Sequence, residues 1–111
     1  MKYEVSIAMQ ARLDMKMIYE YIADTLMEPV TAEKQYTRIE KAVYKLDQMP
    51  ERFRRYEKEP WRSRNLRVMP VDNYNVFYIV NNTKRTVTVF RIMYNRRNTD
   101  KELEGIIPQD N

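Results

Sequence analysis

The strongest constraint on the fold is a regular apolar stripe in the second quarter of the chain. Its members are spaced alternately four and three residues apart, namely Ala32, Tyr36, Ile39, Val43 and Leu46. This spacing places all five side chains on one face of an α-helix. Pro29 suits the first turn of that helix and Pro50 stops it, because proline lacks the amide hydrogen that an interior turn requires. The stripe therefore predicts an amphipathic helix packed against a core.

Another helix is predicted immediately N-terminal to this one, so the striped helix is the second helix in chain order. From about Ala11, apolar residues recur three or four positions apart, as at Met15, Ile18, Ile22 and Leu26. Two helices of roughly 17 to 20 residues joined by a short connection favour an antiparallel hairpin. Both apolar stripes would then turn toward one common core.

The remaining apolar residues alternate with polar ones, as is typical of strands. Candidate strands lie at residues 2–8, 66–71, 74–80 and 85–94. Turn-forming residues separate the last three strands, at Val71-Asp72-Asn73 and at Asn81-Asn82-Thr83. The order predicts an α+β fold: an N-terminal strand, an antiparallel helix hairpin and a three-stranded antiparallel meander. We expect the helices on one sheet face and the opposite face free for function.

Length and composition narrow the class of protein. A chain of 111 residues suits one domain spanning residues 1–111 around one hydrophobic core. Cysteine is absent, which excludes disulfides and thiol catalysis and fits a reducing, cytoplasmic setting. No apolar run approaches the roughly 20 residues that cross a bilayer, so we expect no membrane association. A capping box of Thr99 and Glu102 before Gly105 predicts a short C-terminal helix.

Histidine is absent too, which restricts the possible chemistry further. Any Ser-His-Asp or His-metal mechanism is excluded. Proton transfer would have to use Lys, Tyr, Asp or Glu, with Arg as a fixed cation that stabilises anionic transition states. We therefore expect no metal site and no cofactor.

Positive charge is concentrated in the second half of the chain. Residues 1–50 hold seven basic and eight acidic side chains, a net of −1, whereas residues 51–111 hold thirteen and eight, a net of +5. Two arginine-rich stretches, 52–67 and 90–98, could converge in a meander. Tyr56, Trp61 and Tyr94 lie among their guanidinium groups, a combination that suits RNA binding because cations hold phosphates and rings stack on bases.

Each of these residues also has a structural interpretation. Trp61 can anchor its loop, and arginines that follow the second helix can satisfy its terminal carbonyls. Arg91, inside a strand, must either meet a carboxylate or point into a solvated cleft, because an unpaired buried guanidinium is costly. Arg96 and Arg97, near Tyr94 at a strand end, can equally be surface residues.

Four segments in this order resemble the RelE/ParE superfamily of bacterial toxins over nearly the whole chain. The segments are DMKMIYEYI from Asp14, the second helix ending KLDQMPERFRRY, then LRVMPVDNYNVFYIV and TVTVFRIMYNRRN. The resemblance implies the fold predicted above and the toxin role in a type II toxin-antitoxin system. It also implies a cognate antitoxin protein that wraps the toxin and masks it.

The resemblance implies two mechanisms. Some members cut mRNA in the ribosomal A site without a metal, and in them the 2′-hydroxyl attacks the adjacent phosphorus. On this leading hypothesis the following residues are catalytic: Arg67, Arg91, Tyr94, Arg96 and Arg97. Trp61, Arg62 and Arg64 would bind RNA. The ribonucleases commonly carry an arginine where this chain has Asn75. The main alternative is a ParE-type toxin that poisons DNA gyrase by protein contact, and a third is a degenerate nucleic-acid-binding module.

Overall fold

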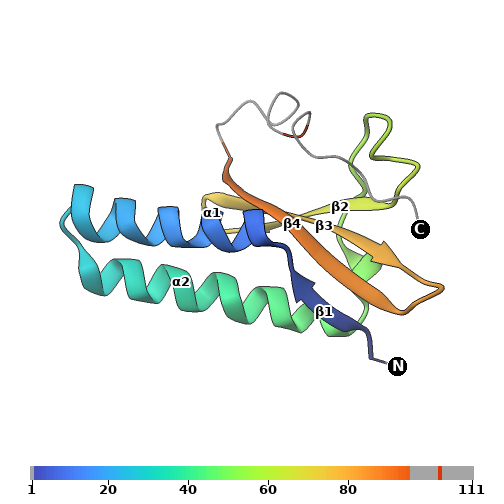
Figure 1. The fold of residues 1–111 in the computed structure, drawn as a ribbon, viewed down its shortest axis with the longest axis horizontal. Coiled ribbons are helices and arrows are strands. Elements are labelled where there is room, and N and C mark those ends of the chain that lie inside the picture. Colours follow the sequence, from blue (N-terminus) through green and yellow to red (C-terminus); the bar gives the residue numbers. More distant parts are fainter. Residues whose placement is uncertain (1, 96–102, 104–111) are drawn as a thin grey trace.

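Two long helices and a four-stranded sheet make up most of the computed structural model, which describes residues 2–95 and 103 (Figure 1). The strands are β1 (Glu4–Ile7), β2 (Leu66–Val71), β3 (Tyr74–Asn81) and β4 (Thr86–Tyr94). The helices are α1 (Met9–Glu20), which continues as a π-helical turn (Tyr21–Thr25), and α2 (Pro29–Tyr44). Short 3-10 turns follow α2 at Lys45–Asp47 and Pro50–Arg52.

The sheet contains the predicted meander and one parallel pair. Its strand order is β1-β4-β3-β2, with β2 antiparallel to β3 and β3 antiparallel to β4. β1 lies parallel to β4, with Glu4 opposite Thr86 and Ile7 opposite Val89. A parallel pair requires a long crossover, and the helix hairpin lies within that connection. The predicted α+β architecture is confirmed.

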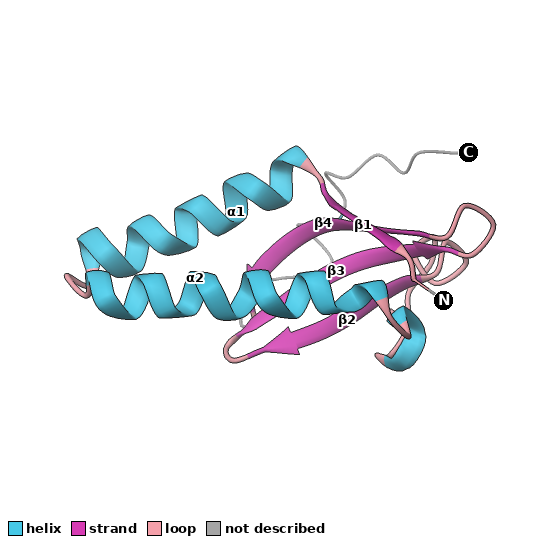
Figure 2. Ribbon diagram, turned by 90° about the horizontal axis from the view of Figure 1, so that it is seen from below, coloured by secondary structure: helices cyan, strands magenta, loops and turns pink. Residues whose placement is uncertain are grey.

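The main core lies between the hairpin and one face of the sheet (Figure 2). Ile39, Val43 and Leu46 of the apolar stripe are buried, as predicted, and α1 contributes Ala11 and Met15. Strand residues on the same face of the sheet complete this core, with a β-bulge shifting the alternation in β4: Met69, Val76, Tyr78, Val80, Val87, Val89 and Ile92. The 3.6-residue period of the helices and the two-residue period of the strands therefore meet in one cluster.

Two members of the predicted stripes are not buried. Leu26 is 49% exposed, and Tyr36 is on the border of exposure. The connected ends of α1 and α2 project beyond the sheet in both ribbon views, so none of the four described strands covers the apolar residues there (Figures 1 and 2). The expectation that both stripes are buried along their whole length is wrong at this end of the hairpin.

The sheet face away from the helices is also covered, so the expectation that it is free for function is wrong for the described residues. A second apolar cluster lies there, made of Trp61, Leu66, Val68, Phe77, Met93 and Leu103. The segment after the last 3-10 turn runs back along β2. Its Tyr56 amide donates to the Leu66 carbonyl, and its Arg54 carbonyl accepts from the Val68 amide.

Two further expectations concern the chain ends and the membrane. The predicted C-terminal capping box of Thr99 and Glu102 lies outside the described residues. Within the described part of the chain, no helix combines the length and the apolar character that crossing a bilayer demands.

Candidate functional site: a cationic groove between α2 and β2

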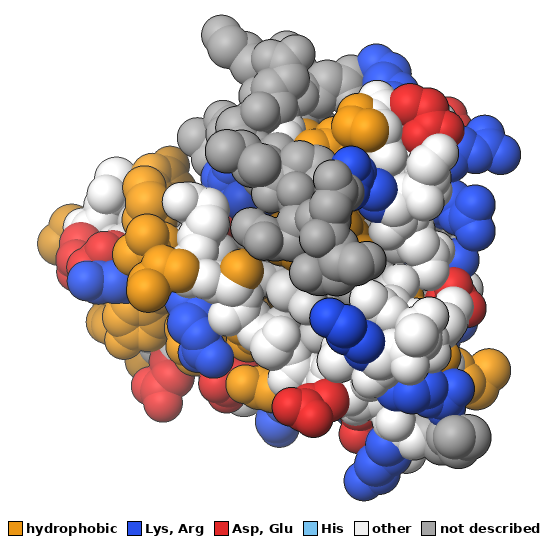
Figure 3. All heavy atoms as spheres, turned by 45° about the vertical axis from the view of Figure 1, so that its right-hand side comes forward, with side chains coloured by type: hydrophobic (Ala, Val, Ile, Leu, Met, Phe, Trp, Pro, Cys, Tyr) orange, Lys and Arg blue, Asp and Glu red, His pale blue; other side chains and the backbone are white. Residues whose placement is uncertain are grey.

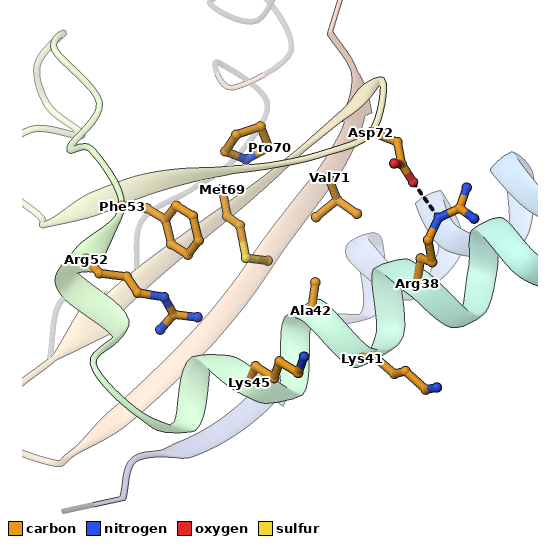
Figure 4. A pocket seen from close by; sticks show the side chains of 10 residues that line it. All are labelled: Arg38, Lys41, Ala42, Lys45, Arg52, Phe53, Met69, Pro70, Val71 and Asp72. Carbon is orange, nitrogen blue, oxygen red and sulfur yellow. Dashed lines mark hydrogen bonds and ion pairs between the residues drawn. The ribbon is translucent and has the colours of Figure 1, made fainter.

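Positive side chains line the side of α2 that faces the edge strand β2. Arg38, Lys41 and Lys45 are spaced three and four residues apart, so they fall on one face of the helix. Arg52, in the 3-10 turn beyond α2, adds a fourth cation at the far end (Figure 4). These four residues form the rim of what we call the cationic groove.

The floor of the cationic groove is apolar. Phe53, Met69 and Val71 point into it from the sheet side, and Ala42 closes it from α2 (Figure 4). The cavity has a volume of about 370 Å³. An apolar floor within a ring of cations suits an acidic segment that carries a few apolar side chains.

Arg52 is fixed in place by the chain that leads into it. Its guanidinium donates hydrogen bonds to the carbonyls of Gln48 and Met49, at 2.6 and 3.0 Å, and lies over the ring of Phe53 at 4.8 Å. Both carbonyls lie between the two 3-10 turns and beyond the end of α2, so Arg52 satisfies the connection and not, as had been expected, the terminal carbonyls of the helix.

Arg38 closes the other end of the cationic groove by an ion pair. Its Nε lies 2.8 Å from Oδ2 of Asp72, and the amide of Gln35 donates to the same oxygen at 2.9 Å. The hydrogen bond from Arg38, followed by that from Gln35, lowers the pKa of Asp72. Asp72 lies in the turn between β2 and β3 with a left-handed φ of 54°, which aspartate tolerates better than most residues.

Arg91 pairs with a carboxylate, which was one of the two environments expected for it, the other being a solvated cleft. Its Nε and Nη2 donate to the two carboxylate oxygens of Asp14, at 2.8 and 3.2 Å, and both side chains are buried. The guanidinium therefore points from β4 toward α1. This geometry gives Arg91 a structural role, and its catalytic role stays a prediction.

Arg67 points in the opposite direction, beyond the other edge of the sheet. Its Nη1 donates to the carbonyls of Glu51 and Phe53, and its Nε donates to Asn65. Its Nη2 also lies 3.3 Å from the Glu51 carboxylate. Arg67 and Arg91 lie on strands separated by β3 and bind opposite flanks, so the structure does not bring these two catalytic candidates together.

The other catalytic candidates lie at or beyond the end of β4. Tyr94 is partly exposed, and its ring meets that of Tyr74 edge to face at 5.8 Å. Burial is the main cause that raises the pKa of Tyr74, followed by the neighbouring Tyr94. Arg96 and Arg97 lie outside the described residues, so their proposed roles stay predictions.

The three predicted RNA-binding residues lie in the segment that covers the second apolar cluster. Trp61 is buried in that cluster, in line with the interpretation that it anchors its loop. Arg62 is exposed and Arg64 is half-buried. The ring of Trp61 is therefore turned into the core, away from any base that the neighbouring arginines could attract.

The sequence interpretation missed the cationic groove. The count of basic residues in each half of the chain favoured 52–67 and 90–98. Two of the four rim cations belong to α2, and Lys45 directly follows it. The available signal was a basic row on the polar face of that helix, formed by Lys34, Arg38, Lys41 and Lys45. Among the described residues, no cluster of acidic side chains could hold a metal ion.

The fold is shared with solved structures of toxin-antitoxin systems. A chain of the chromosomal ParDE system from P. aeruginosa superposes with a TM-score of 0.69 at 19% identity, over 84% of this chain and 96% of that one. A chain of the RelBE2 complex from Mycobacterium tuberculosis gives 0.61 at 16% identity, over 85% and 99%. A chain of the archaeal RelE-RelB complex from Pyrococcus horikoshii OT3 gives 0.59 at 18% identity, over 87% and 99%.

Sequence comparison narrows this class. No curated protein sequence matches the chain significantly. The family model of the ParE toxin of the type II toxin-antitoxin system, parDE, matches residues 5–99. The chain therefore belongs to the ParE toxin family, and it is the toxin component of a type II toxin-antitoxin system.

Proposed function

We propose that this toxin acts by protein contact on DNA gyrase, without cleaving mRNA. The observation that carries this proposal is the internal engagement of Arg67 and Arg91, two of the three described residues expected to be catalytic. Each guanidinium already binds groups of its own chain, and the two point to opposite flanks of the sheet. Membership of the ParE family supports the same choice.

The chemistry of RNA cleavage explains why this engagement matters. A metal-independent ribonuclease needs cations that bind the pentavalent phosphorus more strongly than they bind the substrate. An arginine held in a buried two-point ion pair must lose those bonds before it can stabilise phosphate, and it then leaves a buried carboxylate unpaired. Arg91 is therefore better suited to holding α1 on β4 than to catalysis.

The cationic groove is the proposed docking site of the antitoxin. Lys41 and Lys45 at its rim, together with its apolar floor, complement an acidic segment that also presents apolar side chains. The solved toxin-antitoxin complexes with this fold support the existence of such a partner for this chain. We place the pair in the cytoplasm, where gyrase and its DNA are found.

Induction of the toxin in cells tests the target. We expect growth arrest with accumulating gyrase-linked DNA breaks and intact mRNA. The matched variant Arg96→Ala/Arg97→Ala separates the mechanisms, because it removes the two candidate catalytic cations outside the described residues. Codon-phased mRNA ends that appear with the wild type and vanish with this variant would reject the proposal in favour of the ribonuclease.

Charge reversal in the groove tests the docking site. The product of the adjacent gene serves as the antitoxin, and its affinity is measured by calorimetry. Lys41→Glu/Lys45→Glu should weaken binding by tenfold or more, because the like charges repel an acidic segment. Lys84→Glu, an exposed lysine in the turn between β3 and β4, is the matched control and should change the affinity little. Equal affinities for the two variants would place the antitoxin elsewhere.

A further inference from the structure

The outward face of α1 carries a row of exposed apolar side chains. Met9, Leu13, Met17 and Tyr21 follow one another at intervals of four residues and are 75%, 45%, 64% and 55% exposed. The opposite face of the same helix holds the core residue Met15. Only one apolar face of a helix can pack against the core of a monomer, so the second apolar face of α1 stays exposed to solvent unless a partner covers it. Figure 3 shows hydrophobic side chains gathered on the hairpin side of the molecule.

A charged row runs beside the apolar row, and its sign changes halfway. Arg12 and Lys16 come first, followed by Glu20 and then Asp24 in the π-helical turn. The first three lie within α1 and Asp24 lies in its continuation, at the same interval of four residues. Among the described residues none of these four side chains forms an ion pair, although opposite charges follow each other along the helix. The row is therefore basic at one end and acidic at the other, and within the described part of the chain it has no ion pair.

We propose that this face binds a second copy of the chain, with the two α1 helices packed antiparallel about a two-fold axis. A two-fold axis inverts the direction of the charged row, so the basic half of one copy meets the acidic half of the other. Lys16 then faces Glu20 of the second copy, and the same pair forms twice. The interface is self-complementary, as a closed dimer requires.

The order of the charges favours a second copy over another partner. The lining of the cationic groove holds four cations and one carboxylate, Asp72, and this excess of positive charge suits an acidic segment, whereas the α1 row carries both signs in equal number. The groove lies between α2 and β2, and the α1 row faces away from the sheet that β2 borders. The two surfaces can therefore be occupied together, and the proposal does not depend on the target of the toxin.

The size of the exposed face of α1 determines how strong the dimer is expected to be. A helix of 12 residues is about 18 Å long, so contact along α1 alone is smaller than the roughly 1,600 Å² of a standard interface. The exposed Leu26, Met27 and Val30 at the adjacent hairpin end extend the apolar surface. We expect a reversible dimer with a dissociation constant in the micromolar range.

The test measures the mass of the full chain, made by cell-free synthesis, by sedimentation at increasing concentration. The wild type should shift from monomer to dimer. Lys16→Glu should abolish the shift, because it brings two glutamates together at each pair. Lys16→Glu/Glu20→Lys should restore the dimer, since the exchange rebuilds both pairs with the signs swapped. Met17→Glu should abolish it through the apolar row, and Met49→Glu, equally exposed elsewhere, is the matched control.

Each outcome decides the proposal. Loss of the dimer in both single variants and its return in the exchanged variant would support the antiparallel pairing. A monomer at all concentrations, or a dimer that Lys16→Glu leaves intact, would overturn it. If the variants stay monomeric like the wild type but lose affinity for the antitoxin, the face belongs to the antitoxin instead. Circular dichroism checks that the exposed substitutions preserve the fold.

Discussion

Asp14 and Arg91 form a buried two-point ion pair that ties α1 to β4, with contacts of 2.8 and 3.2 Å. The same carboxylate accepts a hydrogen bond from the backbone amide of Ile92 at 2.9 Å. This contact lies just beyond Val89, where β1 stops pairing with β4. Asp14 therefore satisfies an amide that the end of β1 leaves at the edge of the sheet.

Removal of this carboxylate should destabilise the whole fold. Asp14→Ala leaves a buried guanidinium and a backbone amide without their acceptor, a change that costs roughly 3 to 5 kcal/mol. This is a large share of the roughly 5 to 15 kcal/mol available to a small domain. Urea unfolding of the purified variant measures the loss.

The paired substitution provides the control for Asp14→Ala. Asp14→Leu/Arg91→Met removes both charges, and apolar replacement of a whole buried pair is often neutral. It should recover most of the stability that either single substitution loses. A double variant as unstable as the singles would show that the ion pair itself, rather than the avoidance of an unpaired charge, holds α1 in place.

Local pattern explains how much of the fold the sequence predicts. The strand at 66–71 coincides with β2, and β3 and β4 differ from their predicted ranges by one residue, because alternation and turn residues mark their ends. The parallel pairing of β1 with β4 has no such local signal. The contact between Asp14 and Arg91 spans 77 residues. The sequence pattern could predict that Arg91 meets a carboxylate or a solvated cleft, but it could not identify Asp14 as that carboxylate.

The candidate site was harder to predict for a related reason. Arginine density highlighted Arg67, whose side chain binds Glu51 and Phe53 of its own chain. Whether a cation is available depends on its partners in space, which composition does not contain. Two of the rim cations, Arg38 and Lys41, lie on the polar face of an amphipathic helix whose apolar stripe had been assigned to the core. That polar face had been given no function.

A charge in the stripe of α2 should unfold the protein. Val43 is fully buried between the hairpin and the sheet. Val43→Asp would place an unpaired carboxylate in that core, at a cost of several kcal/mol, which approaches the total stability. Loss of the cooperative thermal transition measures the effect. Val43→Ile, which keeps an apolar side chain, should retain the transition.

Stability should fall on the alkaline side because of one buried tyrosine. The Tyr78 hydroxyl donates to the Pro50 carbonyl at 2.6 Å, and burial raises the pKa of Tyr78 to about 12 from 10.0. Between these two values the unfolded chain has lost a proton that the folded chain keeps, so stability decreases as the pH rises through this window. The full difference corresponds to roughly 2 to 3 kcal/mol.

Phenylalanine at the same position isolates this effect. Tyr78→Phe removes the titrating group, so its stability should depend less on pH between 10 and 12. Its stability at neutral pH should be lower by roughly 1 to 3 kcal/mol, because the buried Pro50 carbonyl loses its donor. An unchanged slope in this variant would assign the alkaline loss to other groups.

The acid side tests the contacts that hold the segment after α2. The carboxylate of Glu51 accepts hydrogen bonds from Asn65 at 2.7 Å and from Asn82 and Arg67 at 3.3 Å. The hydrogen bond from Asn65 is the main cause that lowers the pKa of Glu51 below its usual 4.5. The folded chain therefore binds a proton on Glu51 less readily than the unfolded chain does. The stabilisation is present above the ordinary pKa of 4.5 and is lost as the pH falls through the lowered pKa of the folded chain.

Since the carboxylate is partly exposed, solvent screens the effect of protonating Glu51, and the loss of stability should be small. Glu51→Gln should flatten the fall in urea midpoint between neutral pH and the acid limb, whereas Glu57→Gln on the same connection should follow the wild type. If both variants follow the wild type, the three contacts contribute nothing measurable to acid stability.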